Sequence, residues 1–194
     1  MRGRYPTHLI DVVQRTGAWR VTLRPVLPQD AELQRRFFRA LSAADRYRRF
    51  MTPLTDLRDD MAQRFSDVDH AKHLALLACT VSDAGEAMIG EARCVVVDAR
   101  QPPVGDFAIA VAGDWQRRGL GRILLSRLIS HAAASGISRL VANTLAGNAG
   151  MVALAERCGF AALPERSDRQ LRASSGSCRQ QMCTGSMTCG RCVA

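Results

Sequence analysis

Hydrophobic and polar residues alternate along this chain with two periods, one typical of strands and one typical of helices. The strand-like runs predict a hairpin over residues 8–27 and further strands over 74–80, 87–97, 106–112 and 138–144. Helical spacing predicts helices over residues 30–41, 46–51, 56–73, 120–136 and 148–158. Gly90 interrupts a strand and is a candidate bulge, and Gly136 is a natural helix terminator. This mixture is typical of the α/β (α+β) class.

The regular pattern ends near Pro164. Residues 165–194 are rich in Ser, Arg, Gln, Gly and Cys, and within them only residues 168–172 have a strand-like pattern. We therefore predict one folded domain over residues 1–164, in which residues 1–19 form an N-terminal extension with a hairpin strand. An atypical tail follows over residues 165–194, and an unstructured segment or a frameshifted end both fit its composition.

The composition is that of a globular protein. Of the 194 residues, 47% are hydrophobic and 23% are charged, which excludes fibrous and disordered chains. No apolar run approaches the ~20 residues that a membrane-spanning helix needs. The basic N-terminus lacks the apolar segment of a signal peptide. We expect a soluble, cytoplasmic protein with no membrane partner.

The formal net charge is +9, and nearly all of the positive charge is arginine, because Lys72 is the only lysine. Such a charge favours polyanionic partners, but a coding bias toward arginine explains it equally well. Aromatic residues make up only 5% and do not interleave with the arginines, which disfavours a nucleic-acid surface built on base stacking. The arginine clusters within residues 35–39 and 46–49 fit either an acidic substrate surface or a solvated face.

Cysteine and histidine residues offer weak metal-site signals. Cys79, Cys94 and Cys158 lie singly in apolar patterns, where a free cysteine behaves as a small buried hydrophobe. Four more crowd the last seventeen residues, at Cys178, Cys183, Cys189 and Cys192, but they form a single CxxC with no histidine after it. His70 and His73 stand three apart, as two ligands on one helix face would, yet no third ligand accompanies them. We expect no metal.

The sharpest local feature is Gln116-Arg117-Arg118-Gly119-Leu120-Gly121, which follows a predicted strand and opens a predicted helix. Glycines there let backbone N–H groups converge, and the helix N-terminus adds a partial positive charge, so the turn suits a pyrophosphate. The motif lacks the Lys-Ser/Thr of a Walker loop and the third glycine of a dinucleotide fingerprint. On this motif alone, a plain strand–turn–helix connection is an equally good explanation.

The order of the surrounding elements resembles the GNAT acetyltransferase superfamily. A strand, Q-x-x-G-x-G, a long helix, another strand, Asn148 and then Gly159-Phe160 follow one another over residues 20–163. A closer resemblance is to the acetyltransferase domain of bacterial Pat-type protein lysine acetyltransferases. The fragments that carry it are Tyr5–Leu9, Thr22–Pro25, Ser42–Phe50, Gly105–Ala108 and Asp114–Gln116. Pat-type enzymes can carry a further domain before this one, and we expect none here.

The resemblance implies the GNAT fold, a mixed but mostly antiparallel twisted sheet with helices on both faces and a splayed central strand pair. It implies that the backbone of Ile109, Ala110 and Val111 pairs with the pantetheine amides of acetyl-CoA. The Val111 N–H then polarises the thioester carbonyl as a catalytic donor. Asn148 contacts the coenzyme arm. The phosphates are held by Gln116, Arg117, Arg118, Gly119, Leu120, Gly121 and Arg122.

Asp106 stands where Pat-type enzymes carry a glutamate that acts as general base. The reaction needs a base, because an amine acceptor is protonated at pH 7 and only the free amine attacks. Aspartate is one methylene shorter than glutamate, so we expect proton removal through a bridging water. The alternative is an exposed carboxylate at a strand start without a catalytic role.

Two departures from the family pattern stand out. Many GNAT enzymes use a tyrosine in the last helix to protonate the leaving thiolate, and the matching position here is Ala155. Pat-type sequences often lack this tyrosine as well, so catalysis is not excluded, but no general acid is identified. The second departure is the C-terminus, where a strand pair usually completes the sheet and shapes the acceptor pocket.

These observations together predict an acetyl-CoA-dependent N-acetyltransferase that works by direct attack in a ternary complex. A protein lysine is the first choice of acceptor, and a small-molecule amine is the second. A non-catalytic acyl-CoA-binding module is the alternative, favoured by Ala155 and opposed by Asp106. A nucleic-acid-binding protein rests on charge alone and predicts steeply salt-dependent binding. The oligomeric state stays open.

Overall fold

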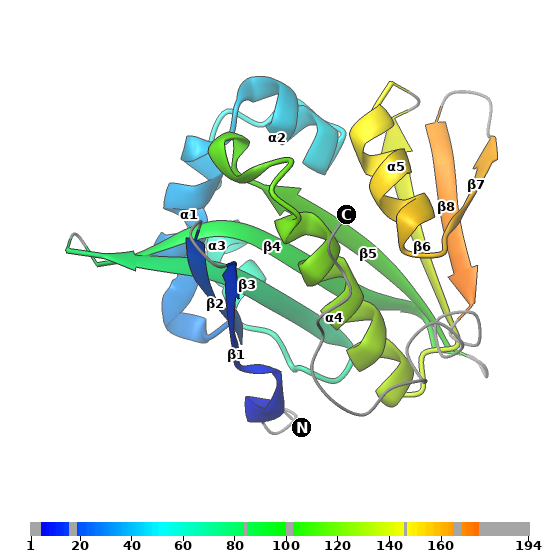
Figure 1. Ribbon diagram of the computed structural model, residues 1–194, viewed down its shortest axis with the longest axis horizontal. Coiled ribbons are helices and arrows are strands. Elements are labelled where there is room, and N and C mark those ends of the chain that lie inside the picture. Colours follow the sequence, from blue (N-terminus) through cyan, green and yellow to red (C-terminus); the bar gives the residue numbers. More distant parts are fainter. Residues whose placement is uncertain are drawn as a thin grey trace.

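The computed structural model describes residues 5–15, 19–83, 85–99, 103–145, 147–164 and 168–174 (Figure 1). Its strands are β1 (Asp11–Arg15), β2 (Trp19–Pro25), β3 (His73–Ser82), β4 (Gly85–Asp98), β5 (Val104–Val111), β6 (Arg139–Leu145), β7 (Ala161–Pro164) and β8 (Asp168–Ser174). Its α-helices are α1 (Ala31–Ala40), α2 (Ala43–Phe50), α3 (Asp59–Ser66), α4 (Leu120–Ala134) and α5 (Ala149–Arg157). Short 3-10 turns are η1 (Thr7–Leu9), η2 (Pro28–Asp30) and η3 (Gly113–Trp115).

In the described part of the chain the strands form one sheet, in the order β1-β2-β3-β4-β5-β6-β8-β7. All neighbouring pairs are antiparallel except β5 and β6, which are parallel. The parallel register covers only Val104 to Asp106 on β5, opposite Arg139 to Val141 on β6. Beyond that point the two strands diverge, as Figure 1 shows. The mixed, mostly antiparallel sheet with one splayed pair is therefore confirmed.

Helices cover both faces of the sheet and give it two separate cores. Helices α4 and α5 pack on one side, which we call the α4 face, over a core that includes Leu76, Phe107, Leu124, Leu140, Ala142 and Ala155. Helices α1 and α3 pack on the other, the α1 face, over a core that includes Phe37, Leu41, Val68, Leu77 and Met88. The alternation of side chains along each strand assigns successive residues to opposite faces.

Local sequence signals set two helix ends and one strand irregularity. Ser42 caps α2 by accepting a hydrogen bond from the Asp45 N–H, and Gly136 has a φ of 80° just after α4. The register of β3 and β4 shifts between Ala78 and Cys79, directly opposite Gly90, which confirms the bulge. A Cβ on Gly90 would lie 3.1 Å from a Leu124 methyl group, so glycine lets α4 approach the sheet closely there.

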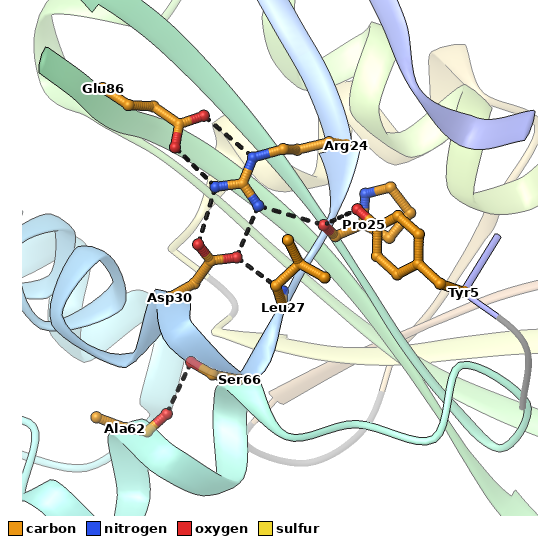
Figure 2. A network of polar contacts seen from close by, with 8 residues as sticks. All are labelled: Tyr5, Arg24, Pro25, Leu27, Asp30, Ala62, Ser66 and Glu86. Atoms are coloured by element: carbon orange, nitrogen blue, oxygen red, sulfur yellow. Dashed lines mark hydrogen bonds and ion pairs between the residues drawn. The ribbon is translucent and has the colours of Figure 1, made fainter. Parts of the chain in front are cut away.

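A polar network fixes the N-terminal part of the sheet (Figure 2). The Arg24 guanidinium donates to both oxygens of Asp30, at 2.7 and 2.9 Å, and to both oxygens of Glu86, at 2.8 and 3.0 Å. Asp30 also accepts from the Leu27 N–H at 2.7 Å, and the Tyr5 hydroxyl donates to the Pro25 carbonyl at 2.9 Å. The network joins β2 to the start of α1 and to the β3–β4 hairpin.

Other outcomes of the sequence analysis are mixed, and some of its expectations fall outside the described residues. Strand β7 was not predicted, whereas β8 confirms the strand expected within residues 168–172. His70 lies in a bend and His73 starts β3, so the two residues do not share a helix face, and the weak metal-site signal that their spacing gave has no support. The four clustered cysteines at Cys178, Cys183, Cys189 and Cys192 lie outside the described residues, and the domain boundary at 164 stays a prediction.

Candidate functional site

The divergence of β5 and β6 leaves backbone groups of β5 without a strand partner on the β6 side. The Ala112 N–H donates to the Ile89 carbonyl of β4 at 2.9 Å, and Glu91 of β4 stands opposite Ala110. Because peptide groups alternate sides along an antiparallel strand, the N–H groups of Ile109 and Val111 point away from β4, toward β6. Strand β6 has already turned away at this level, so these two N–H groups face the gap between the strands.

Gln116 closes one end of this gap. Its side-chain Nε2 donates to the Val111 carbonyl at 3.0 Å, which satisfies that acceptor and leaves the N–H of Val111 toward the gap. The chain then turns through Arg117 and Gly119, with φ angles of 61° and 87°. Both angles are left-handed, and glycine adopts such a conformation without strain. The turn delivers the chain directly into the N-terminus of α4 at Leu120.

The first turn of α4 lies close to both β5 and α5. A Cβ on Gly121 would stand 3.3 Å from a Leu154 methyl group and 3.9 Å from a Val111 methyl group. Leu120 is fully buried in the core of the α4 face and anchors the first turn of the helix there. The free N–H groups at this helix end carry a partial positive charge and are suited to bind phosphate.

Arginine side chains add full positive charges at the same place. Arg117, Arg118 and Arg122 are exposed, and among the described residues none of them pairs with a carboxylate. The Arg118 guanidinium lies over the ring of Trp115 at 5.4 Å, and Trp115 in turn packs edge-on against Trp19. The surroundings of the α4 N-terminus are therefore cationic and uncompensated, as an anion site needs.

Asn148 lies at the opposite side of the gap, at the end of the loop that follows β6. Its side-chain oxygen accepts a hydrogen bond from the Met151 N–H at 3.2 Å and so caps α5. The side-chain NH₂ group is not needed for this cap, so it stays available to donate elsewhere.

Asp106 lies on the α1 face, at the last residue pair before β5 and β6 diverge. Directly opposite it stand Val95 of β4 and Val141 of β6, which share its face. Burial raises the pKa of the Asp106 carboxyl group, and the positive charge of Arg49 and the Phe107 N–H partly offset this rise. A raised carboxyl pKa beside a gap in the sheet is suited to proton transfer near neutral pH.

A buried charge cluster near Asp106 was missed at the sequence level. Glu91 is 3% exposed and accepts from Arg49 of α2 at 3.0 Å and from Arg93 at 3.1 Å. Arg93 also donates to the Phe65 carbonyl and contacts His73 Nε2 at 2.7 Å. The two arginines hold the pKa of Glu91 at about 2, whereas burial and Arg93 hold that of His73 at about 4. The sequence feature that could have revealed this cluster is the presence of two charged residues, Glu91 and Arg93, inside an otherwise apolar strand.

The arginine clusters of the first helices are mostly neutralised by carboxylates. Arg35 and Arg36 pair with Glu32, Arg39 pairs with Asp56, and Arg48 pairs with Asp45. These pairs are largely exposed and contribute little to stability. Of the two interpretations that the sequence left open, the solvated charged face agrees better with this pairing.

Ala155 is fully buried in α5, so no side-chain hydroxyl comes from that position. Within the described ranges, no group of three or more His, Cys, Asp or Glu residues is arranged to hold a metal ion. No helix in the same ranges is both long enough and apolar enough to cross a membrane.

Comparisons with known proteins agree with this geometry. Residues 20–161 match the family model described as the acetyltransferase (GNAT) domain. The acetyltransferase Pat of Mycolicibacterium smegmatis is 33% identical over 150 residues, which cover 77% of this chain and 44% of that protein. The chain thus spans less than half of the length of this relative.

One further relative is similar to part of the chain, and one solved structure has a similar fold. The ribosomal protein bS18-alanine N-acetyltransferase of Salmonella typhimurium is 48% identical over 54 residues, which cover 28% of this chain and 36% of that protein. The crystal structure of the GNAT domain of S. lividans PAT superposes with a TM-score of 0.79 and 24% identity. The superposition covers 88% of this chain and 99% of that one, and it shows the same fold.

Proposed function

This chain belongs to the GNAT acetyltransferase family, and we propose that it transfers the acetyl group of acetyl-CoA to an amine, with a protein lysine as the acceptor. The observation that supports this most is the gap between β5 and β6. It joins a cationic helix N-terminus on the α4 face to a carboxyl group on the α1 face. A cosubstrate on one face and an acceptor on the other can therefore meet within the sheet.

The coenzyme lies on the α4 face in this proposal. Backbone N–H groups from Gly119 to Arg122, with the side chains of Arg117 and Arg118, bind its phosphates. Ile109 and Val111 bind the pantetheine amides through their gap-facing peptide groups, and the Asn148 side chain contacts the same arm. The peptide groups of Ala110 point toward β4, so this residue contributes a small side chain rather than a backbone hydrogen bond.

The acceptor approaches from the α1 face. Asp106 removes a proton from the ammonium form of the acceptor through a bridging water, and the free amine then attacks the thioester carbonyl carbon. The Val111 N–H stabilises the negative charge that develops on the carbonyl oxygen. The C–N bond forms as the C–S bond breaks, and both substrates are present together.

One observation favours a lysine side chain as acceptor, and a second favours a protein acceptor in general. Asp106 lies between Val95 and Val141, so a long aliphatic stem that ends in an amine matches the apolar flanks and the single carboxylate. Val95 is 38% exposed and is therefore open to a substrate. The partial relative from Salmonella typhimurium is named for acetylating a protein, which agrees with a macromolecular acceptor. A cytoplasmic location agrees with the buried free thiols of Cys79 and Cys94.

The first experiment is a calorimetric titration of the protein with acetyl-CoA, followed by an acceptor screen. We expect micromolar binding and acetylation of lysine-containing peptides in preference to small amines. Preference for small amines would replace the lysine acceptor by the small-molecule alternative. Binding without turnover on any amine would favour an acyl-CoA-binding module, and an absence of binding would contradict the proposal.

Substitution of Asp106 tests the catalytic role directly. Asp106→Asn is expected to keep the affinity for acetyl-CoA and to lower kcat by about 10²- to 10⁴-fold, because it removes a general base. Asp114→Asn is the matched control, since Asp114 is an exposed aspartate of the following turn. Equal rates for the Asp106 and Asp114 variants would show that Asp106 is not the base.

A further inference from the structure

Thr144 of β6 carries a polar group that the fold does not satisfy. The residue is 1% exposed, and among the described residues its hydroxyl Oγ1 has no hydrogen-bond partner. Buried polar groups in native proteins are nearly always paired, so an unpaired one calls for an explanation. The mechanism proposed above does not use this hydroxyl.

The strand register places Thr144 beside the gap. Asp106 of β5 stands opposite Val141 of β6 at the last parallel pair. Three residues further along each strand, Thr144 is level with Ile109. Ile109 is one of the two residues whose peptide groups face the gap. On its other side β6 stays paired with β8 as far as Leu145, so Thr144 is held in a regular strand at the edge of the gap.

The alternation of side chains places the Thr144 hydroxyl on the α4 face. Leu140 and Ala142, which precede it by four and two residues, belong to the core beneath α4 and α5. Ile109 packs against the same core, and the fully buried Ala155 of α5 is part of it. The unpaired hydroxyl therefore lies on the side of the sheet where the proposed coenzyme arm enters the gap.

The proposed acetyl transfer is assisted by a hydrogen-bond donor close to the sulfur atom of the coenzyme. When the C–S bond of a thioester breaks, the sulfur carries a negative charge, and a nearby donor stabilises it. Ala155 has no hydroxyl to offer. The geometry points to Thr144 as the group that donates a hydrogen bond to the sulfur of the coenzyme, an inference that rests on the proposed acetyl transfer.

The step balances without an additional reactant. The amine nitrogen gives its electron pair to the carbonyl carbon, and the C–S electron pair leaves on sulfur as thiolate. The ammonium form of the acceptor loses one proton to Asp106 before the attack, and Asp106 passes it to solvent. The nitrogen loses a second proton to solvent as the amide forms. Thr144 keeps its proton throughout, because an aliphatic hydroxyl is far too weak an acid to release it; it lowers the energy of the thiolate by a charge-assisted hydrogen bond. The thiolate takes its proton from solvent on release.

The test compares coenzyme A with desulfo-coenzyme A, which lacks the sulfur, as ligands of the wild type, Thr144→Val and Thr144→Ser. Valine has nearly the same shape as threonine, and it replaces an unpaired hydroxyl, so the variant is expected to fold with an unchanged or higher melting temperature. The fraction of coenzyme A that is present as thiolate rises with pH. Calorimetric affinities are therefore measured at pH 7 and at pH 9 for each protein with each ligand, together with kcat at neutral pH.

We expect Thr144→Val to bind coenzyme A about tenfold more weakly than the wild type and to lose a similar factor in kcat, because a hydrogen bond to a charged group is lost. Its affinity for desulfo-coenzyme A should equal that of the wild type, and Thr144→Ser should behave as the wild type with both ligands. Equal losses with both ligands, or no loss with either, would overturn the inference. A wild type that binds neither ligand would instead overturn the proposed function itself.

Discussion

At the residue scale, two opposing effects act on the pKa of the Asp106 carboxyl group. Burial between strands raises the pKa of its carboxyl group, while the guanidinium of Arg49 lowers it. Arg49 is held in place by Glu91, whose own charge is fixed by Arg93. The charge cluster therefore acts on the proposed base indirectly, through the position of one arginine.

Arg49→Met removes a positive charge near Asp106 and is expected to raise the pKa of that carboxyl group further. Since the base must be deprotonated, the acid limb of the kcat/KM profile should move to higher pH. Arg49→Lys keeps the charge and is the control, with an acid limb close to that of the wild type. The profile is measured over pH 5 to 9 with saturating acetyl-CoA. An unmoved acid limb in the methionine variant would show that Arg49 does not influence the base.

At the scale of elements, the start of α4 depends on how closely the helix approaches its neighbours. Gly119 supplies a left-handed φ, and Gly121 leaves room for Leu154 of α5 and Val111 of β5. The two glycines of the motif therefore have different tasks. One turns the backbone into the helix, and the other lets the helix end come close to the gap.

Gly121→Val places a branched side chain against Leu154, where even a Cβ would be 3.3 Å away. Overpacking of this kind costs about 1–3 kcal/mol, so the melting temperature should fall. The helix end is also expected to move away from β5, which weakens binding of acetyl-CoA. Gly113→Ala is the control, because a Cβ there meets nothing within 4 Å. Calorimetry and thermal unfolding are measured for both; unchanged affinity in the valine variant would show that this close approach does not shape the cradle.

At the scale of the whole molecule, the sheet separates two environments. Near its helix end the α4 face carries arginines that no carboxylate of the described residues pairs with, whereas the α1 face buries a charged cluster of Glu91, Arg93 and His73. Burial and Arg93 lower the pKa of His73 to about 4, below its ordinary value of 6.5. His70 and His131 also have lowered pKa values, mainly because they are buried.

Stability should therefore fall as the pH drops from 6.5 to 4. In that window the unfolded chain binds protons that the folded His73 does not, so the free energy of unfolding rises with pH. The contribution of His73 is on the order of 2 kcal/mol after allowance for solvent screening. Denaturant unfolding at pH 4, 5, 6 and 7 measures it. His73→Gln, which has no titrating group, should show a shallower slope, and an identical slope would contradict this assignment.

The sequence by itself determined the order of the strands and helices other than β7, because hydrophobic periodicity and the capping signals at Ser42, Asn148 and Gly136 are local properties of the chain. Together with the Gln116–Gly121 motif, this order was enough to indicate the family. Only the tertiary structure decided which groups face the gap, because the parting of β5 and β6 after Asp106 depends on packing between distant segments. The pairing of Arg49 with Glu91 and the isolation of the Thr144 hydroxyl were decided in the same way. Both depend on which distant segments bury these side chains, and no local sequence pattern specifies that.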